Sequence, residues 1–350
     1  MSATVPDVTA PAPSRRGRFL SVVVPAAQRR DLAELTDRLD LSSGEVRAKH
    51  SAFWAMLVLS GLIAIAGIVT DSTATVIGAM IIAPLSTPIL GFGLGVVTGR
   101  GRLLGRSALY VLGGLVVVVV LGWLVALVLP QTSEVVTNSQ VTGRTSPGVG
   151  DLVAAFATGF AGAIALARRD LGDVLPGIAI AISLVPPLGV VGVCLGAGEP
   201  SLAAGALLLF GSNVVALVIA STVVFTGAGY ASDAAQVRQD AGGRRRPRRA
   251  VVLGAAAVVL VALPMVANTV QATLADVWAG QVRSAAEAWL AGTPDADVED
   301  VTWQGTEVVV DVRGPGDLPD VAQLQATVDD LVPWQPEVTV VHTVGKRVEG

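Results

Sequence analysis

Long apolar runs separated by short polar segments dominate the hydrophobic pattern of this chain. Each run is free of charged side chains in its interior and approaches or exceeds the length that crosses a hydrocarbon layer of about 30 Å as a helix. The runs are residues 52–70, 73–99, 107–129, 151–167, 173–197, 202–226 and 250–271. This pattern predicts an all-α polytopic membrane protein with seven spans.

The second run, residues 73–99, is interrupted near its middle by Pro84 and Pro88. Proline lacks an N–H and clashes with the preceding turn, so a helix is expected to bend or break there. Such a break leaves the carbonyls of Met80 and Pro84 without their usual donors, and in lipid these need protein partners or a water-filled cavity. Two hypotheses stay open: a kinked structural helix, or a broken helix that lines a pathway.

The same stretch has a second copy 99 positions later in the chain. Residues 52–104 align with residues 151–203 without a gap and share twelve identities. The most informative identities are at Asp, Gly and Pro, because these residues occur where the backbone turns or breaks, whereas apolar residues match by composition alone. They are Asp71/Asp170, Gly78/Gly177, Pro88/Pro187, Gly93/Gly192 and Gly99/Gly198. The second copy has its own predicted break at Pro186 and Pro187, which frees the carbonyls of Ile182 and Ser183.

Basic residues lie in alternate connections between the runs, which predicts that these connections face the cytoplasm. They are Arg47, Lys49, Arg100, Arg102, Arg106, Arg168, Arg169 and the arginines of residues 238–249. The opposite connections contain Asp71, Glu199 and residues 130–150, whose only basic residue is Arg144. Since each copy holds three spans, the second is inserted upside down relative to the first. Inverted repeats with broken helices recur in transporters, with the site near the midplane.

The predicted organisation therefore has six parts. They are a cytoplasmic N-terminal segment (1–50), a first membrane repeat (51–130), an inverted second repeat (131–230), a basic cytoplasmic loop (231–249), the seventh span (250–271) and an extracytoplasmic acidic domain (272–350). In the N-terminal segment we expect disorder to residue 17, a strand over Arg18–Val24 and a helix over Ala26–Leu39. This piece is too small for a core of its own, so we expect it to dock on the membrane domain or a neighbouring subunit.

The tail from Ala272 differs from the rest of the chain, because it holds 14 acidic residues against four basic ones. Its pattern predicts a helix over 273–291, strands over 298–303 and 307–312, a helix over 318–331 and a strand over 336–343. The result is a small extracytoplasmic α+β domain. Its acidic surface is expected to confer solubility or to concentrate cations.

Composition supports the membrane class, since 52% of the residues are hydrophobic, only 15% are charged and mean hydropathy is +0.65. The single cysteine, Cys194, lies in an apolar run and excludes a disulfide framework. His50 and His342 have no catalytic or ligating neighbours in the sequence. We therefore expect no catalytic site, no metal, no cofactor and no nucleic-acid partner.

Neutral polar residues near mid-span are the candidate contacts for a permeant species. A hydroxyl can instead bond a local carbonyl, whereas the Asn213 amide needs partners and aligns with Gly114 in the other copy. Asn213 is expected to face the freed carbonyls, either joining helices or contacting a solute. The candidate pathway set is Ser60, Met80, Pro84, Ser86, Thr87, Pro88, Thr158, Ile182, Ser183, Pro186, Pro187, Ser212 and Asn213.

Two further groups are expected to serve packing and anchoring. Gly91, Gly95 and Gly99 recur every four residues and allow close helix approach, within one chain or between subunits of a homo-oligomer. The basic stretch Arg244, Arg245, Arg246, Arg248 and Arg249 is expected to fix topology or to bind anionic lipid.

The stretch Ile77–Leu85, followed by Pro88 and Ile89, resembles the bacterial membrane family catalogued as domain of unknown function 389. The resemblance covers roughly residues 45–230 and implies a prokaryotic inner-membrane protein. It supplies no activity or substrate. Family members often carry a fuller cytoplasmic domain before the first span than this chain has.

Together these patterns predict a transporter or channel for a small solute or ion, with a midplane site between the two repeats. Freed carbonyls favour a cation and half-helix N-termini favour an anion, so the sign of the charge stays open. The alternative is a membrane scaffold or sensor that displays a partner-binding extracytoplasmic domain.

Overall fold

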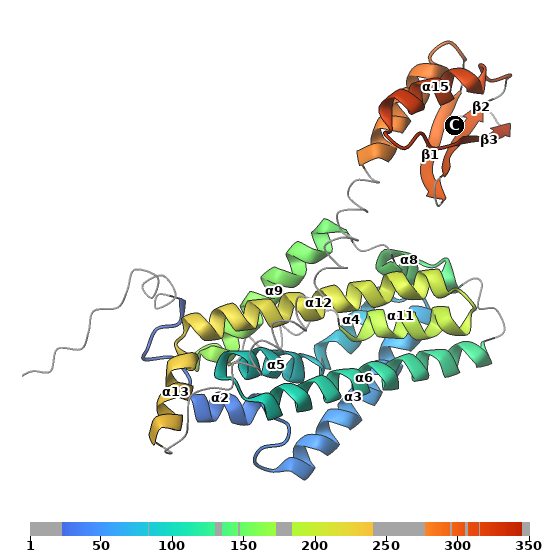
Figure 1. The fold of residues 1–350 in the computed structure, drawn as a ribbon. Coiled ribbons are helices and arrows are strands. Elements are labelled where there is room, and N and C mark those ends of the chain that lie inside the picture. Colours follow the sequence, from blue (N-terminus) through green and yellow to red (C-terminus); the bar gives the residue numbers. More distant parts are fainter. Residues whose placement is uncertain are drawn as a thin grey trace, which may run out of the picture. The chain divides into compact units, whose positions relative to one another are not determined.

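A computed structural model of the chain describes residues 23–82, 84–129, 135–145, 148–172, 184–240, 277–294, 296–304, 307–314 and 316–344. The chain divides into two compact units, Met1–Val266 and Ala267–Gly350. Each unit is described by itself (Figure 1). The described part of the first unit is mainly helical, and the second combines helices with a sheet.

Among the described residues, four helices are long and apolar enough to cross a membrane. They are α3 (Val46–Val69), α6 (Gly101–Val128), α9 (Val149–Ala167) and α12 (Pro200–Gly227). The pair α4 (Thr73–Ile82) and α5 (Ser86–Thr98) is bent by 45° and makes a fifth candidate. A shorter apolar helix, α11, covers Val185–Gly196. The predicted seventh span and residues 173–183 of the fifth lie outside the described residues.

The predicted interruption of residues 73–99 is confirmed, and the prolines have different parts in it. Pro84 lies between α4 and α5, whereas Pro88 is in the first turn of α5. Pro186 and Pro187 likewise occupy the first turn of α11. First-turn N–H groups have no acceptor within the helix, so proline is tolerated there. Pro88 therefore helps to start a helix rather than to interrupt one.

Both α3 and α6 begin about one and a half turns earlier than the apolar pattern predicts. The basic residues Arg47, Lys49, Arg102 and Arg106 consequently lie on helices, although the sequence places them in connections. Long basic side chains can extend from a helix end into water while their stems cover apolar surface. For α3 and α6, the first residue of the helix therefore precedes the first residue of the apolar run.

Polar contacts join the N-terminal segment to four other parts of the first unit at one end of that unit. This is the end where α2 (Leu32–Leu39) and α13 (Tyr230–Asp240) lie (Figure 1). The contacts are Lys49–Asp37 (2.7 Å), Arg100 Nη1–Thr36 Oγ1 (3.0 Å), Arg168 Nη1–Val23 O (2.8 Å) and Arg29–Asp233 (2.6 Å). The start of α3, the start of α6, the end of α9 and the end of α12 thus lie together. Helices α3 and α9 therefore run in opposite directions, and so do α6 and α12.

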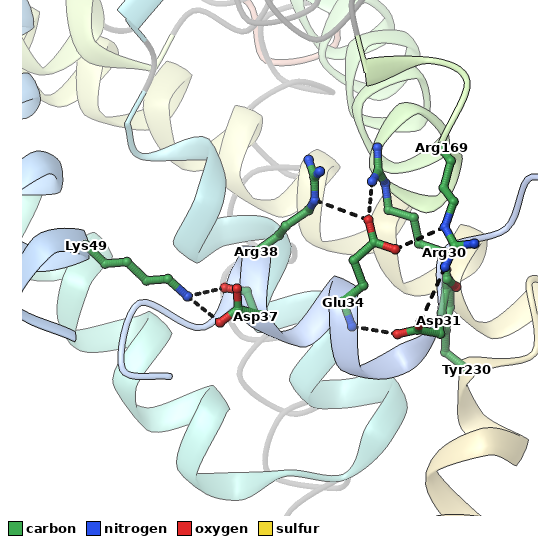
Figure 2. Close-up of polar contacts among 8 residues, drawn as sticks. All are labelled: Arg30, Asp31, Glu34, Asp37, Arg38, Lys49, Arg169 and Tyr230. Carbon is green, nitrogen blue, oxygen red and sulfur yellow. Dashed lines mark hydrogen bonds and ion pairs between the residues drawn. The ribbon is translucent and has the colours of Figure 1, made fainter. Parts of the chain in front are cut away.

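The N-terminal segment docks on the helices of its own chain through α2, and Figure 2 shows its charged contacts. Leu32, Leu35 and Leu39 are buried, as the helical spacing predicts. Glu34 accepts hydrogen bonds from Arg30 Nη1 at 2.5 Å and from Arg169 Nε at 3.1 Å. The second of these bonds ties the segment to the connection after α9.

Two predictions for this segment are wrong in detail. The helix begins at Leu32 rather than Ala26, because the Asp31 side chain accepts the N–H of Glu34 and caps the helix there. Val23 and Val24 do not form a strand. The other residues of the predicted strand lie outside the described residues.

The short helices α5 and α11 each pack against the long helices of both halves. Helix α5 contacts α6 and α12, and α11 contacts α12 and α6. A Cβ on Gly93 of α5 would clash with Ser221 Oγ of α12. A Cβ on Gly192 of α11 would clash with the Val119 carbonyl and lie 2.8 Å from Gly122 Cα of α6. Gly93 and Gly192 are 99 positions apart, and so are Gly122 and Ser221; this is the same offset that aligns residues 52–104 with residues 151–203.

The second unit has the predicted α-β-β-α-β order. Residues 277–290 are helical, and strand β1 (Asp297–Gln304) pairs antiparallel with β2 (Glu307–Gly314). Helix α15 (Val321–Leu331) then leads to β3 (Val338–Val344), which pairs parallel with β2. Valines at alternate positions of β2 are buried against both helices in one apolar core, so the domain has the core expected of an α+β fold.

Candidate functional site

Three of the predicted pathway residues line one cavity in the first unit. Met80, Thr158 and Asn213 border a space of about 350 Å³ together with Arg144 and Asp151. The rest of the described lining is Gly143, next to Arg144, and four apolar residues of α9 and α12: Ala154, Ala155, Leu209 and Leu217. The volume is within the range of small-molecule sites, which also combine an apolar wall with a few polar groups.

Close packing of α9 on α12 brings together the cavity-lining residues that belong to the second half of the chain. A Cβ on Gly159 would lie 3.0 Å from Ala220 Cβ and 3.2 Å from Leu217 Cα. The adjacent Thr158 and the buried Asn213 therefore border the same space from two helices. Met80 reaches it from α4, two residues before the end of that helix at the break.

Arg144 belongs to α8 (Ser139–Thr145), the short helix in the connection between the two halves. The end of α8 approaches α12 so closely that a Cβ on Gly205 would clash with the Thr145 carbonyl. The guanidinium Nη1 donates to the Gln140 carbonyl at 2.7 Å and to Gln140 Oε1 at 3.1 Å. Burial lowers the pKa of Arg144 from its ordinary value, because water no longer fully solvates the charge.

Gln140 is itself held by the turn that follows α3. Its backbone N–H donates to Asp71 Oδ1 at 3.2 Å, and its side-chain amide donates to Thr73 Oγ1 at 2.9 Å. Asp71 Oδ1 also accepts the Ser139 hydroxyl at 2.7 Å. This network fixes the helix that bears Arg144 to the first half, whereas most of the cavity lining comes from the second.

Three hydroxyl side chains of the predicted set donate to backbone carbonyls, namely those of Ser60, Thr158 and Ser212. Ser60 Oγ donates across to the Ala79 carbonyl of α4 at 2.8 Å, and both residues are buried. Ser212 Oγ bonds the Leu209 carbonyl of its own helix at 2.7 Å. Thr158 Oγ1 bonds the Ala154 carbonyl at 2.9 Å while it borders the cavity.

The segments beside the two predicted breaks begin in an apolar core rather than a polar layer. Leu85 and Ile89 at the start of α5 share one buried cluster with their repeat counterparts Leu184 and Leu188 at α11. Pro88, Pro186 and Pro187 are buried, and Pro84, Ser86 and Thr87 are half-buried. Ile182 and Ser183 lie outside the described residues, as do the predicted anchors Arg244, Arg245, Arg246, Arg248 and Arg249. The described polar space is therefore displaced from the prolines toward α8, α9 and α12.

The three glycines predicted for packing meet neighbours within this chain or end a helix. A Cβ on Gly91 would lie 2.7 Å from the Leu39 carbonyl, and one on Gly95 would lie 3.0 Å from Leu104 Cγ. Gly99 ends α5 with a φ of 64°, a left-handed conformation that glycine adopts without strain.

Arg144 and Asp151 are the cavity residues that the candidate set omits. Arg144 is the only basic residue of the connection 130–150, and this isolation is the signal that could have identified it. Asp151 resembles an ordinary first-turn residue, and its Oδ2 accepts the Gly148 N–H at 2.9 Å. Within the described ranges, no group of three His, Cys, Asp or Glu side chains could hold a metal ion.

Comparison with known proteins gives a family and a relative but no function. Residues 80–219 match the family model described as "Domain of unknown function (DUF389)". The "Uncharacterized protein MJ0678" of Methanocaldococcus jannaschii is 32% identical over 174 residues, which are 50% of this chain and 53% of the relative. The chain thus spans about half the length of this curated relative, which is archaeal rather than bacterial. No solved structure matches the chain.

Proposed function

We propose that this chain, which carries a DUF389 domain over residues 80–219, is an integral membrane protein. It moves a small solute or ion through the cavity lined by Met80, Thr158 and Asn213. The family description names no function, so the proposal depends on the geometry of the site. The transport role, the pathway and the inverted repeat are all part of this proposal.

Membrane insertion is supported by the apolar helices and by what they expose. Leu109, Leu112 and Leu127 of α6 are 57–69% exposed, and such a surface suits lipid rather than water. The basic residues Arg29, Lys49, Arg100 and Arg168 meet at the α2 end. By the positive-inside rule we assign this end to the cytoplasm. The family match and the archaeal relative support a prokaryotic inner membrane as its location. The placement of the second unit outside the cell depends on the span predicted over 250–271.

The single observation that carries the transport proposal is that one cavity takes its lining from both halves. Met80 belongs to the first half, Thr158 and Asn213 belong to the second, and Arg144 belongs to the connection between them. Counterpart helices run in opposite directions, and Gly93 and Gly192 make equivalent contacts with the opposite half. In transporters built from inverted repeats, the site lies between the two copies. A cavity lined from both halves supports the same design in this chain.

Flux into proteoliposomes tests the proposal. The purified full chain is reconstituted, and uptake is measured for four probes that differ in charge: acetate, acetamide, glycine and Rb⁺. We expect protein-dependent uptake of at least one probe, reduced by tenfold or more in Asn213→Leu. Ser212→Ala, which removes a hydroxyl bonded to its own helix, serves as the adjacent control and should retain uptake. Folded protein that passes none of the probes, or equal uptake by both variants, contradicts the proposal.

A further inference from the structure

The guanidinium of Arg144 has hydrogen-bond capacity that its own helix does not use. An arginine side chain has five N–H donors, and the two on Nη1 are directed to oxygens of Gln140. Within the described residues, Nε and Nη2 of Arg144 have no hydrogen-bond or ion-pair partner. Three donors on a cation that borders the cavity are therefore available to a molecule inside it.

No carboxylate of the described residues forms an ion pair with Arg144. Other arginines of the first unit, such as Arg29 and Arg168, form ion pairs at 2.6–2.7 Å. Arg144 forms none with a described residue, although it is mostly removed from water. A partly desolvated charge without a partner is costly, and an anion in the cavity would remove that cost.

Asp151, the acidic residue of the same lining, is occupied elsewhere. Its Oδ2 accepts the Gly148 N–H at 2.9 Å, so the carboxylate serves as the cap of α9. It lies in the first turn of that helix, where the dipole stabilises a negative charge. Among the described residues, Asp151 forms no ion pair with Arg144, so its carboxylate does not occupy the three unused donors of the guanidinium.

The guanidinium is held in place before any ligand arrives. Gln140, which fixes Nη1, is 4% exposed and is bonded to Asp71 and Thr73. The end of α8 is fixed against α12 at Gly205. Because these contacts already limit the rotamers of Arg144, binding costs less conformational entropy than it would at a free surface arginine.

We infer that the cavity binds a small solute bearing an oxyanion, a carboxylate or phosphate group, through the Nε and Nη2 donors of Arg144. The paired donors of arginine match the paired oxygens of such a group. Thr158 and Asn213 border the rest of the space and would contact the remainder of the solute. This inference deepens the proposed function and depends on it only for the use of the cavity in transport.

Ligand-induced stabilisation of the full chain in detergent tests the anion site without any flux. The probes are acetate, its neutral isostere acetamide, and inorganic phosphate, and the readout is the shift in thermal midpoint against concentration. We expect acetate or phosphate to stabilise the wild-type chain and acetamide to have no effect. The half-saturating anion concentration should rise at least tenfold in Arg144→Gln and by a smaller factor in Arg144→Lys, which keeps the charge but loses the fork.

Arg106→Gln is the matched control, since it removes an exposed arginine of α6 away from the cavity. It should bind the anion as the wild type does. Equal stabilisation by acetamide, or unchanged anion affinity in both Arg144 variants, overturns the inference. Arg144-dependent stabilisation without flux of any probe supports the anion site and contradicts the transport proposal. Flux that does not depend on Arg144 and favours neutral solutes supports the transport proposal and contradicts the anion site.

Discussion

The Asp71 carboxylate accepts the backbone N–H of Gln140 at 3.2 Å and thereby joins the turn after α3 to the helix that bears Arg144. Asp71 adopts a left-handed φ of 50°, which is uncommon for a residue with a side chain. The same oxygen accepts the Ser139 hydroxyl. Two residues nearly seventy positions apart in the chain therefore determine where the cavity arginine sits.

Asp71→Asn should loosen α8. The Ser139 hydroxyl and the Gln140 N–H lower the pKa of Asp71 from its ordinary value of 3.8, with desolvation acting in the other direction. A lowered pKa stabilises the folded contact above the ordinary value, and this contribution is lost as the pH falls below 3.8. We expect faster amide hydrogen exchange over residues 139–145 in the variant at pH 7, and in the wild type only in strong acid. Unchanged exchange in the variant would mean that Asp71 does not hold the helix.

Alanine at Gly192 should destabilise the helical unit more than alanine at Gly93. The added Cβ at Gly192 meets backbone atoms of Val119 and Gly122, which cannot move aside, and overpacking costs ~1–3 kcal/mol. The clash at Gly93 is chiefly with the Ser221 hydroxyl, so Ser221→Ala should recover part of the loss. Thermal midpoints in detergent measure both effects.

Gly211→Ala is the control for these variants, since a Cβ there meets no atom within 4 Å. Alanine is the better helix former, so this change should be neutral or stabilising by up to ~1 kcal/mol. If Gly192→Ala is as stable as Gly211→Ala, α11 does not pack against α6 as the structure describes.

Glu34→Gln should release the N-terminal segment from the helices. Desolvation raises the pKa of Glu34, but the hydrogen bonds from Arg30 and Arg169 outweigh it, and the net pKa is below the ordinary 4.5. The ionised carboxylate thus stabilises docking above pH 4.5, and the effect is lost as the pH falls below that value. We expect faster proteolysis within residues 23–45 in the variant at pH 7. Glu45→Gln, at a helix start without a side-chain cap, should match the wild type.

Truncation before Val277 should leave much of the flux intact. The second unit has its own apolar core, built from the helix 277–290, the sheet and α15, and it contributes no residue to the described cavity lining. A scaffold or sensor that acts through a displayed domain would instead lose its function on truncation. Uptake by the truncated chain, compared at equal reconstituted amount, separates the two functions.

The apolar pattern was sufficient for most of the helices, because burial and lipid exposure act on long runs of residues. The break at Pro84 and the α-β-β-α-β order of the second unit were predictable, since proline and alternating valines act locally. The position of Arg144 was not predictable, because it depends on Asp71 and Gly205, which are far from it in the chain. The apolar surroundings of Leu85 and Leu184 were missed for the same reason: they arise only when the two halves pack together.

The most direct measurement of the central claim is the block of flux by a thiol reagent inside the cavity. Cys194→Ala removes the single, buried cysteine, and Thr158→Cys then places a thiol at the cavity wall. An anionic, membrane-impermeant methanethiosulfonate should abolish the uptake seen before modification. Ser212→Cys in the same background, at a buried position outside the lining, should be unaffected. Uptake that persists after complete modification of the thiol in the Thr158→Cys variant would show that the solute does not pass through this cavity.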